Sequence, residues 1–339
     1  MRNYKIDFLR FIGLIMIILA HSSPDPIVFQ IRNFDVPLMV FISGVSFNLS
    51  YKANVSYRKY VLKRIKRLAL PVWVFLTFYF IISIVCGINY SIIEIATSYL
   101  FLSGIGYVWI IRVFLMVALI APLLYWVSTK IKSNLLFLLL LIISYIVYDV
   151  IQYNLHSYFE NYFYLQILDR IIFYIIPYSL IYLLGMRIHN FTKKTSVILM
   201  VGSSLIFAFT ALYLSHEQGQ FVQTNNYKYP ISFYYLTYAL AITLILWLWS
   251  DKLWNRLKES FIRNIILFIA QNSIWIYLWH IPYINLINKY HHNYIIEYLF
   301  VVLLSVSTVG LQRWILDKMI FPAITKEKLK KDLRYILTG

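Results

Sequence analysis

The chain has 339 residues, of which 61% are hydrophobic and only 13% are charged. Soluble domains contain roughly 45–50% apolar and about 25% charged residues, so a soluble globular fold is excluded and lipid must solvate much of this protein. The net charge is +17, and the basic residues lie between apolar runs. Membrane topology and attraction to anionic lipid headgroups explain such a pattern, so we expect no nucleic-acid partner.

Apolar runs long enough to cross a bilayer recur along the chain. About 20 helical residues span the hydrocarbon core. The runs that meet this length are 7–23, 34–51, 68–88, 107–127, 135–153, 170–188, 196–215, 232–249, 265–284 and 295–314. We therefore predict an all-α, polytopic membrane bundle of about ten transmembrane helices. The shorter apolar segment 91–104 is either a re-entrant or interfacial piece or an eleventh span.

Lys and Arg alternate between the segments that connect these runs. Only four of the 31 fall on one set of alternate segments, namely Arg32, Arg170, Lys228 and Lys289. Short loops rich in Lys and Arg remain in the cytoplasm, so both termini are expected there. The alternation requires ten crossings, which argues against 91–104 as a full span. We divide the chain into a transmembrane domain, residues 1–316, and a short basic cytoplasmic tail, residues 317–339.

The first predicted helix carries three ionisable side chains in an apolar environment. Asp7 and Arg10 are three residues apart, and His21 follows Arg10 by eleven residues. At about 100° per residue, eleven steps return to within about 20° of the starting direction, so all three line one stripe. Ionisable groups inside a bilayer are costly and tend to face functional cavities. The alternative is a buried polar seam that only holds helices together.

A second cluster precedes the third predicted helix. Arg64 and Arg67 are three residues apart at its expected cytoplasmic end. Guanidinium groups make forked bonds to phosphate oxygens, so the pair suits a phosphate-bearing ligand, although ordinary positive-inside charge explains it equally well. Other polar residues interrupt apolar runs, and each taken alone is more typical of packing or anchoring: Asp35, Trp109, Arg112, Ser273 and His280.

Five motifs follow one another along the chain. They are Arg10 with His21 after ten intervening residues, the stretch 35–44 (DVPLMVFISG), Arg64-Ile-Lys-Arg67, Trp109, and the stretch 272–280 (NSIWIYLWH). Together they resemble the signatures of the acyltransferase 3 family of bacterial membrane O-acyltransferases, over nearly the whole chain. Two features depart from the family pattern. Arg112 stands where an apolar residue is expected, and the acidic partner has three candidates: Glu94, Asp149 and Glu160.

The resemblance implies a multi-pass enzyme of the bacterial cytoplasmic membrane. It would move an acetyl group from cytoplasmic acetyl-CoA, a co-substrate, to a hydroxyl of a cell-surface polysaccharide or its lipid-linked precursor, without a metal. Its partners would be acetyl-CoA, the glycan acceptor and membrane lipids. Direct transfer and an acyl-histidine intermediate both remain open.

The resemblance also assigns roles to residues. His21 is expected to be the catalytic base, with Arg10 and Asp7 on the same face, and Arg64 and Arg67 are expected to hold the CoA phosphates. The candidates for an acceptor or oxyanion site are Asp35, Trp109, Arg112, Ser273 and His280.

Two other functions were weighed against the acyltransferase. The first is an exporter or flippase for a polysaccharide or lipid-linked sugar, which would also need basic residues at the ends of a polar path through the membrane. Transporters commonly contain a repeat of broken helices, and the sequence has none. A glycan polymerase would be expected to have large outer loops, whereas the predicted outer loops here are short.

Overall fold

The computed structural model describes residues 3–52, 55–102, 104–105, 107–257, 261–287 and 293–338, and within these ranges the chain is helical without any strand. This confirms the all-α prediction. The α-helices in chain order are α1 (Tyr4–His21), α2 (Pro26–Arg32), α3 (Asp35–Ser50), α4 (Tyr57–Val85), α5 (Ile92–Tyr99), α6 (Trp109–Lys130), α7 (Asn134–Glu160), α8 (Phe163–Arg187), α9 (Lys193–Gln218), α10 (Phe233–Arg256), α11 (Phe261–Gln271), α12 (Ser273–Ile287), α13 (Tyr294–Ile315), α14 (Phe321–Ala323) and α15 (Glu327–Leu337). Short 3-10 turns η1 (Ile188–Asn190) and η2 (Thr224–Tyr227) and a π-helical turn η3 (Leu316–Ile320) complete the described elements.

The described helices include eight candidate membrane spans, or nine if the bent pair α11 and α12 forms one span. This confirms a polytopic membrane bundle. The predicted number of about ten differs because of α1, which has 18 residues but carries three charged ones: Lys5, Asp7 and Arg10. The orientation of the termini stays a prediction.

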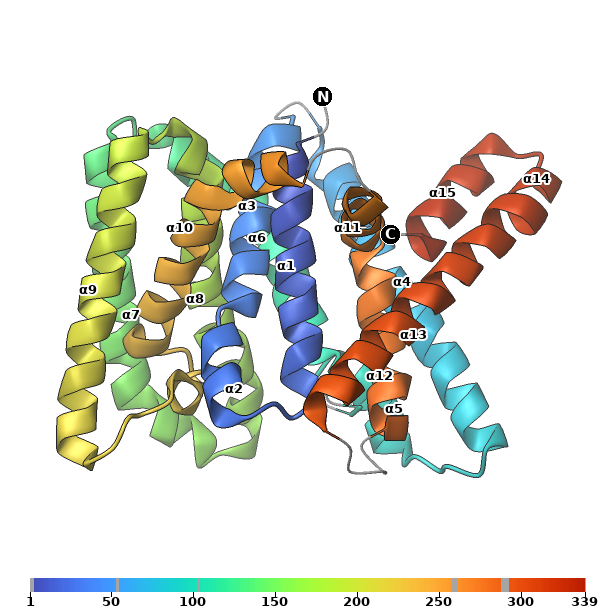
Figure 1. Cartoon of the computed structure of the whole chain (residues 1–339), viewed down its shortest axis with the longest axis horizontal. Coiled ribbons are helices and arrows are strands. Elements are labelled where there is room, and N and C mark those ends of the chain that lie inside the picture. Colours follow the sequence, from blue (N-terminus) through green and yellow to red (C-terminus); the bar gives the residue numbers. More distant parts are fainter. Residues whose placement is uncertain are drawn as a thin grey trace. The chain divides into compact units, whose positions relative to one another are not determined.

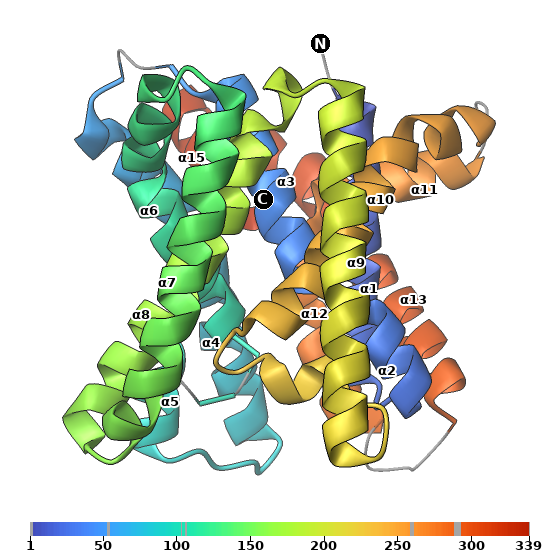
Figure 2. The ribbon, with the colours of Figure 1, turned by 90° about the vertical axis from the view of Figure 1, so that its left-hand side faces the viewer.

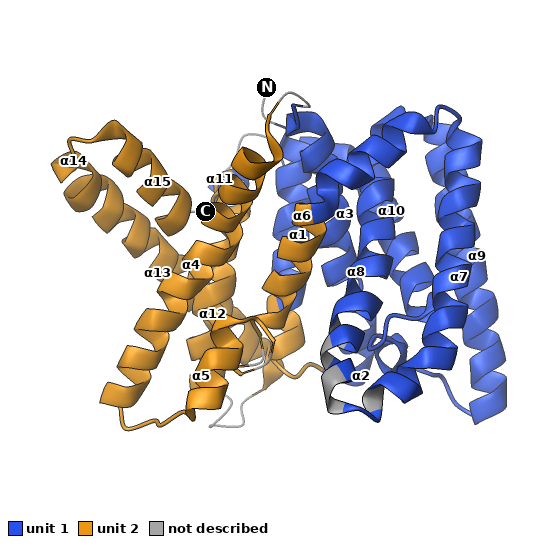
Figure 3. Cartoon of the chain, turned by 180° about the vertical axis from the view of Figure 1, so that it is seen from behind, with its two compact units in different colours: residues 1–17, 25–52, 120–263 blue, residues 18–24, 53–119, 264–339 orange. Residues whose placement is uncertain are grey.

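The helices pack as two compact units (Figure 3). Unit 1 comprises Met1–Ile17, Asp25–Lys52 and Ile120–Arg263, and unit 2 comprises Ile18–Pro24, Ala53–Leu119 and Asn264–Gly339. Three of the described helices, α1, α6 and α11, therefore contribute residues to both units.

Unit 1 is centred on a close contact between α3 and α8. An ideal Cβ atom built on Gly44 would lie 2.2 Å from the Tyr182 carbonyl oxygen, and one built on Gly185 would lie 2.1 Å from the Phe41 carbonyl oxygen. Small residues let membrane helices approach backbone to backbone, which gains dispersion contacts where lipid supplies no hydrophobic drive. Around this contact α7 packs on α8 (Figure 2), and α9 packs along α10 (Figure 1).

Gly44→Ala is expected to destabilise unit 1 by about 1–3 kcal/mol, the usual cost of overpacking. The added methyl group meets backbone atoms of α8, which no change of rotamer can move aside. Gly202→Ala in α9 is the matched control, because its Cβ would meet no atom within 4 Å and alanine favours a helix by up to about 1 kcal/mol. Thermal unfolding in detergent measures both. Equal unfolding temperatures for the two variants would contradict the close contact.

Unit 2 is built on α12, which packs against α13 and α4. The indole of Trp279 donates to Gln312 of α13 at 2.8 Å, and Gln312 donates onward to the Leu337 carbonyl at the end of α15 at 2.7 Å. Trp275 of α12 donates to the Ile336 carbonyl at 3.1 Å. These side chains connect the C-terminal helix α15 to α12 and α13.

The ninth predicted span, 265–284, is not one straight helix. It breaks at Asn272 into α11 and α12, which meet at an angle of 85°. The Asn272 side-chain amide donates to the Phe268 carbonyl at 2.7 Å, and Arg313 donates to its oxygen at 3.4 Å. Asparagine side chains that bond to nearby backbone compete with helix continuation, which gives the break a local cause.

The segment 91–104 contains α5, whose eight residues are too few to cross a membrane. This agrees with the charge alternation, which left no place for an eleventh span. Further along, the helical backbone continues from α13 through η3 and α14 to Ala323 as one candidate span, beyond the predicted domain boundary at residue 316. That boundary, and the cytoplasmic position of the tail, stay predictions.

Candidate functional site

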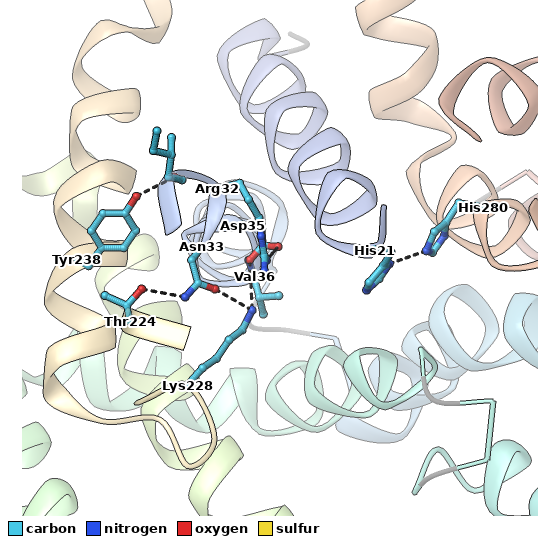
Figure 4. A network of polar contacts seen from close by, with 10 residues as sticks. His21, Arg32, Asn33, Asp35, Val36, Thr224, Lys228, Tyr238 and His280 are labelled. Carbon is cyan, nitrogen blue, oxygen red and sulfur yellow. Dashed lines mark hydrogen bonds and ion pairs between the residues drawn. The ribbon is translucent and has the colours of Figure 1, made fainter. Parts of the chain in front are cut away.

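Two histidines meet in unit 2. His21 is the last residue of α1, and its Nδ1 atom lies 2.8 Å from Nε2 of His280 in α12. The ring planes are 13° from parallel and their centroids are 5.0 Å apart, so the two rings meet edge to edge (Figure 4). His280 is fully buried, whereas His21 is partly exposed. The two predicted site histidines, 259 residues apart, therefore form one hydrogen-bonded pair.

The hydrogen bonds of His280 set the tautomer of His21. Nδ1 of His280 contacts the Tyr277 carbonyl oxygen, which can only accept, so this nitrogen carries the hydrogen. In a neutral ring Nε2 is then an acceptor, and the contact with His21 requires Nδ1 of His21 to donate. With both rings neutral, the unprotonated and basic nitrogen of His21 is its Nε2 atom.

An aromatic side chain borders the histidine pair. The Tyr107 ring stands edge-on to His21 at a centroid distance of 4.4 Å and to His280 at 5.7 Å. The Tyr277 hydroxyl donates to the Tyr107 carbonyl, so one turn of α12 fixes both His280 and this tyrosine. Burial raises the pKa of the Tyr107 hydroxyl, which keeps it protonated and neutral. No motif singled out Tyr107, apart from its place next to the Trp109 motif.

The other candidates of unit 2 lie on the same helices or next to them. Ser273 is the first residue of α12, which places it about 10 Å along the helix from His280 at 1.5 Å per residue. Trp109 begins α6. Arg112, one turn later, is 7% exposed, and its Nη1 atom lies 3.4 Å from the Leu102 carbonyl oxygen. Their roles at an acceptor or oxyanion site stay predictions.

The arginine pair lies in the first half of α4, beside the C-terminal helix. The Arg64 guanidinium lies over the Tyr60 ring, 4.9 Å from its centroid, and Arg67 is exposed. Between them, Lys66 forms an ion pair with Asp332 of α15 at 2.7 Å. We expected a cytoplasmic tail here but did not predict that α15 packs against α4 beside the arginine pair.

Asp7 and Arg10 belong to the part of α1 in unit 1. Arg10 lies 3.5 Å from the Asp7 carboxylate and donates to the Ser46 hydroxyl of α3 at 2.8 Å. The side chain thus joins α1 to α3, which is the seam expected under the structural alternative. Because α1 is continuous, the eleven-residue spacing still places His21 on the same helix face as Arg10.

Asp35 begins α3, as predicted, and is buried with two cations. Its carboxylate accepts from Arg32 at 2.9 Å and lies 3.7 Å from the Lys228 ammonium. We expected Arg32 and Lys228 in outer loops and paired neither with Asp35. Arg32 is close to Asp35 in the sequence, but nothing local connects Asp35 with Lys228.

The three candidates for an acidic partner have different surroundings. Glu94 of unit 2 closes the capping box of α5 with Ser91, and that hydrogen bonding lowers its pKa. Asp149 of unit 1 accepts from the Phe233 amide at 3.0 Å. The side chain of Glu160 lies outside the described residues. His21 itself is hydrogen-bonded to His280 and in ring contact with Tyr107.

These helices and the buried polar residues define a multi-pass membrane protein with a candidate proton-transfer site. A model of the acyltransferase 3 family, described as an acyltransferase domain, matches residues 3–311. The chain therefore belongs to the acyltransferase 3 family and is a membrane acyltransferase. No curated protein and no solved structure matched the chain.

Proposed function

We propose that this acyltransferase moves an acetyl group from cytoplasmic acetyl-CoA to a hydroxyl of a cell-surface polysaccharide or its lipid-linked precursor, in the cytoplasmic membrane of a bacterium. The observation that carries the proposal is the pairing of His21 with His280, which leaves Nε2 of His21 as the basic nitrogen. An imidazole with a defined tautomer is suited to take a proton from a sugar hydroxyl.

The reaction then needs two proton movements. His21 Nε2 takes the hydroxyl proton as the sugar oxygen attacks the thioester carbonyl, and the tetrahedral intermediate expels the CoA sulfur. The imidazolium returns the proton to that sulfur, so CoA leaves as the thiol and the acetyl group remains as an ester. In the alternative route, His21 itself attacks the thioester and then passes the acetyl group to the sugar.

Arg64 and Arg67 are proposed to hold the CoA phosphates. Arg64→Ala with Arg67→Ala should weaken acetyl-CoA binding at least tenfold, since each charged hydrogen bond contributes about 1.5–3 kcal/mol. Isothermal titration of the full-length protein in detergent measures the effect. Arg58→Ala is the matched control, because Arg58 is an exposed arginine of the same helix. If the double variant and the control bind acetyl-CoA alike, the pair serves only topology.

The acceptor is tested in cells that express the chain or an empty vector. Base-labile acetate released from the extracted surface glycan should rise with expression of the wild-type chain. The rival function, a glycan exporter or flippase, predicts more glycan at the surface with no gain in acetate per sugar.

A further inference from the structure

A buried cationic cluster joins the short connections of unit 1 at the start of α3. Arg32, Asp35 and Lys228 expose 2%, 2% and 6% of their side chains. Arg32 and Lys228 both approach the Asp35 carboxylate, and the Lys228 ammonium also donates to Asn33 at 3.1 Å (Figure 4). Asn33 in turn donates to the Thr224 hydroxyl at 2.9 Å, so α2 and η2 are held around the same point.

The charges of this cluster do not balance. Two cations share one carboxylate, which also accepts from the Val36 amide at 2.8 Å. Buried charges are costly unless they are paired, and one excess positive charge remains here. Burial lowers the pKa of the Lys228 ammonium to about 8, against the opposing effect of Asp35, so it is still largely charged at neutral pH.

The cluster also contains buried hydrogen-bond donors that have no acceptor in the described part of the chain. Arg32 Nε is buried and has no hydrogen-bond partner among the described residues, and the same holds for the side-chain nitrogen of Gln30. The Lys228 ammonium lies 5.6 Å and 5.7 Å from the ring centroids of Tyr229 and Tyr235. The cluster therefore combines buried donors, one unbalanced cation and aromatic faces. In such a low-dielectric site an anionic group is stabilised more strongly by these groups than it would be in water.

Positive-inside charge does not explain this arrangement. Arg32 and Lys228 are two of the four basic residues that the alternation assigns to the outer segments, and both are buried rather than facing a headgroup. A structural ion pair would need one cation for Asp35, and the cluster has two.

We propose that the cluster of Arg32, Asp35 and Lys228 binds a singly charged oxyanion, a phosphodiester or a carboxylate, carried by the acyl acceptor. One such group would neutralise the excess charge, and a guanidinium with an ammonium supplies charge-assisted donors for its oxygens. The inference rests on the proposed function for the existence of a glycan acceptor. It narrows that acceptor to an anionic glycan or a lipid-linked glycan phosphate.

The test measures binding, not acyl transfer. Full-length protein in detergent is titrated with glucuronate, with glycerophosphoglycerol as a soluble phosphodiester, and with neutral methyl glucoside. At least one charged probe should bind and the neutral sugar should not. Lys228→Gln should weaken that binding at least tenfold, Lys228→Arg should largely keep it, and Lys194→Gln, at an exposed lysine of α9, should leave it unchanged. Thermal unfolding checks that each variant is folded.

A second arm separates the sources of the oxyanion. Phosphatidylglycerol in mixed micelles presents the same phosphodiester on a lipid, and if it competes better than the soluble probes, the site takes a lipid-borne phosphate. If glucuronate competes best, the site takes an acidic sugar. Failure of both charged probes to bind, or equal binding by the Lys228→Gln and Lys194→Gln variants, would overturn the proposal.

The two proposals fail differently. Charge-dependent binding by a protein that transfers no acetyl group would refute the proposed function and leave the oxyanion site without an acyl acceptor as its source. Acetyl transfer at the wild-type rate by the folded Lys228→Gln variant, with an unchanged KM for the glycan, would refute only the oxyanion site.

Discussion

His21→Ala is expected to reduce acetyl transfer by about 10²–10⁴-fold, the usual contribution of a general base. The reason is the defined tautomer, because Nε2 of His21 is the basic nitrogen when Nδ1 donates to His280. The measurement is base-labile acetate per sugar in extracted surface glycan, at matched protein level. His216→Ala, which removes a histidine with 89% of its side chain exposed, is the control and should leave transfer unchanged.

His280 provides the sharper comparison, because its predicted role is to position His21. A glutamine oxygen can accept the hydrogen of His21 Nδ1, and an alanine cannot. His280→Gln should therefore keep more transfer than His280→Ala, and the pH profile of the glutamine variant should still report one imidazole. Full transfer in His21→Ala with loss in His280→Ala would place the base on α12. Full transfer in both alanine variants would show that neither histidine is the base.

Asp35→Asn is expected to destabilise the protein by about 3–5 kcal/mol, because it leaves Arg32 and Lys228 buried without their carboxylate. Thermal or denaturant unfolding in detergent, without added anion, measures this. Asp251→Asn is the matched control, since Asp251 is 63% exposed in its ion pair with Lys5, and such pairs contribute about 0–1 kcal/mol.

The double variant Asp35→Asn with Lys228→Met identifies the cause of that loss. Removing the second cation relieves the repulsion, so the double variant should be more stable than Asp35→Asn alone. If Asp35→Asn unfolds like Asp251→Asn, the cluster is more solvated than its burial indicates, and the charge argument fails.

Apolar runs were sufficient to predict the eight candidate spans, because bilayer thickness imposes a length that hydropathy detects directly. They did not predict the break at Asn272. Asn272 lies at the break with its side-chain amide bonded to the Phe268 carbonyl, while the hydropathy stays high on both sides. The sequence did predict that 91–104 is not a full span, because the alternation of Lys and Arg is a constraint independent of hydropathy. The eight residues of α5 agree with this.

The candidate site was predictable only in part. The spacing of Arg10 and His21 singled out α1, because the period of a helix converts a distance in sequence into a shared face. The partner of His21 could not be deduced in this way, since His280 approaches from a helix that follows hundreds of residues later. The pairing of Arg32 with Asp35 was local, but Lys228 and Tyr107 join their clusters through tertiary packing.

Reconstitution in liposomes tests directly whether His21 drives transfer of an acetyl group from acetyl-CoA to a glycan hydroxyl. Purified protein in liposomes receives acetyl-CoA labelled in the acetyl group, together with the deacetylated surface glycan or its lipid-linked precursor. Base-labile label is expected in the glycan with the wild-type chain, and at least a hundredfold less with His21→Ala. Glycan that crosses the bilayer without acquiring label, or equal labelling by the two proteins, would contradict it.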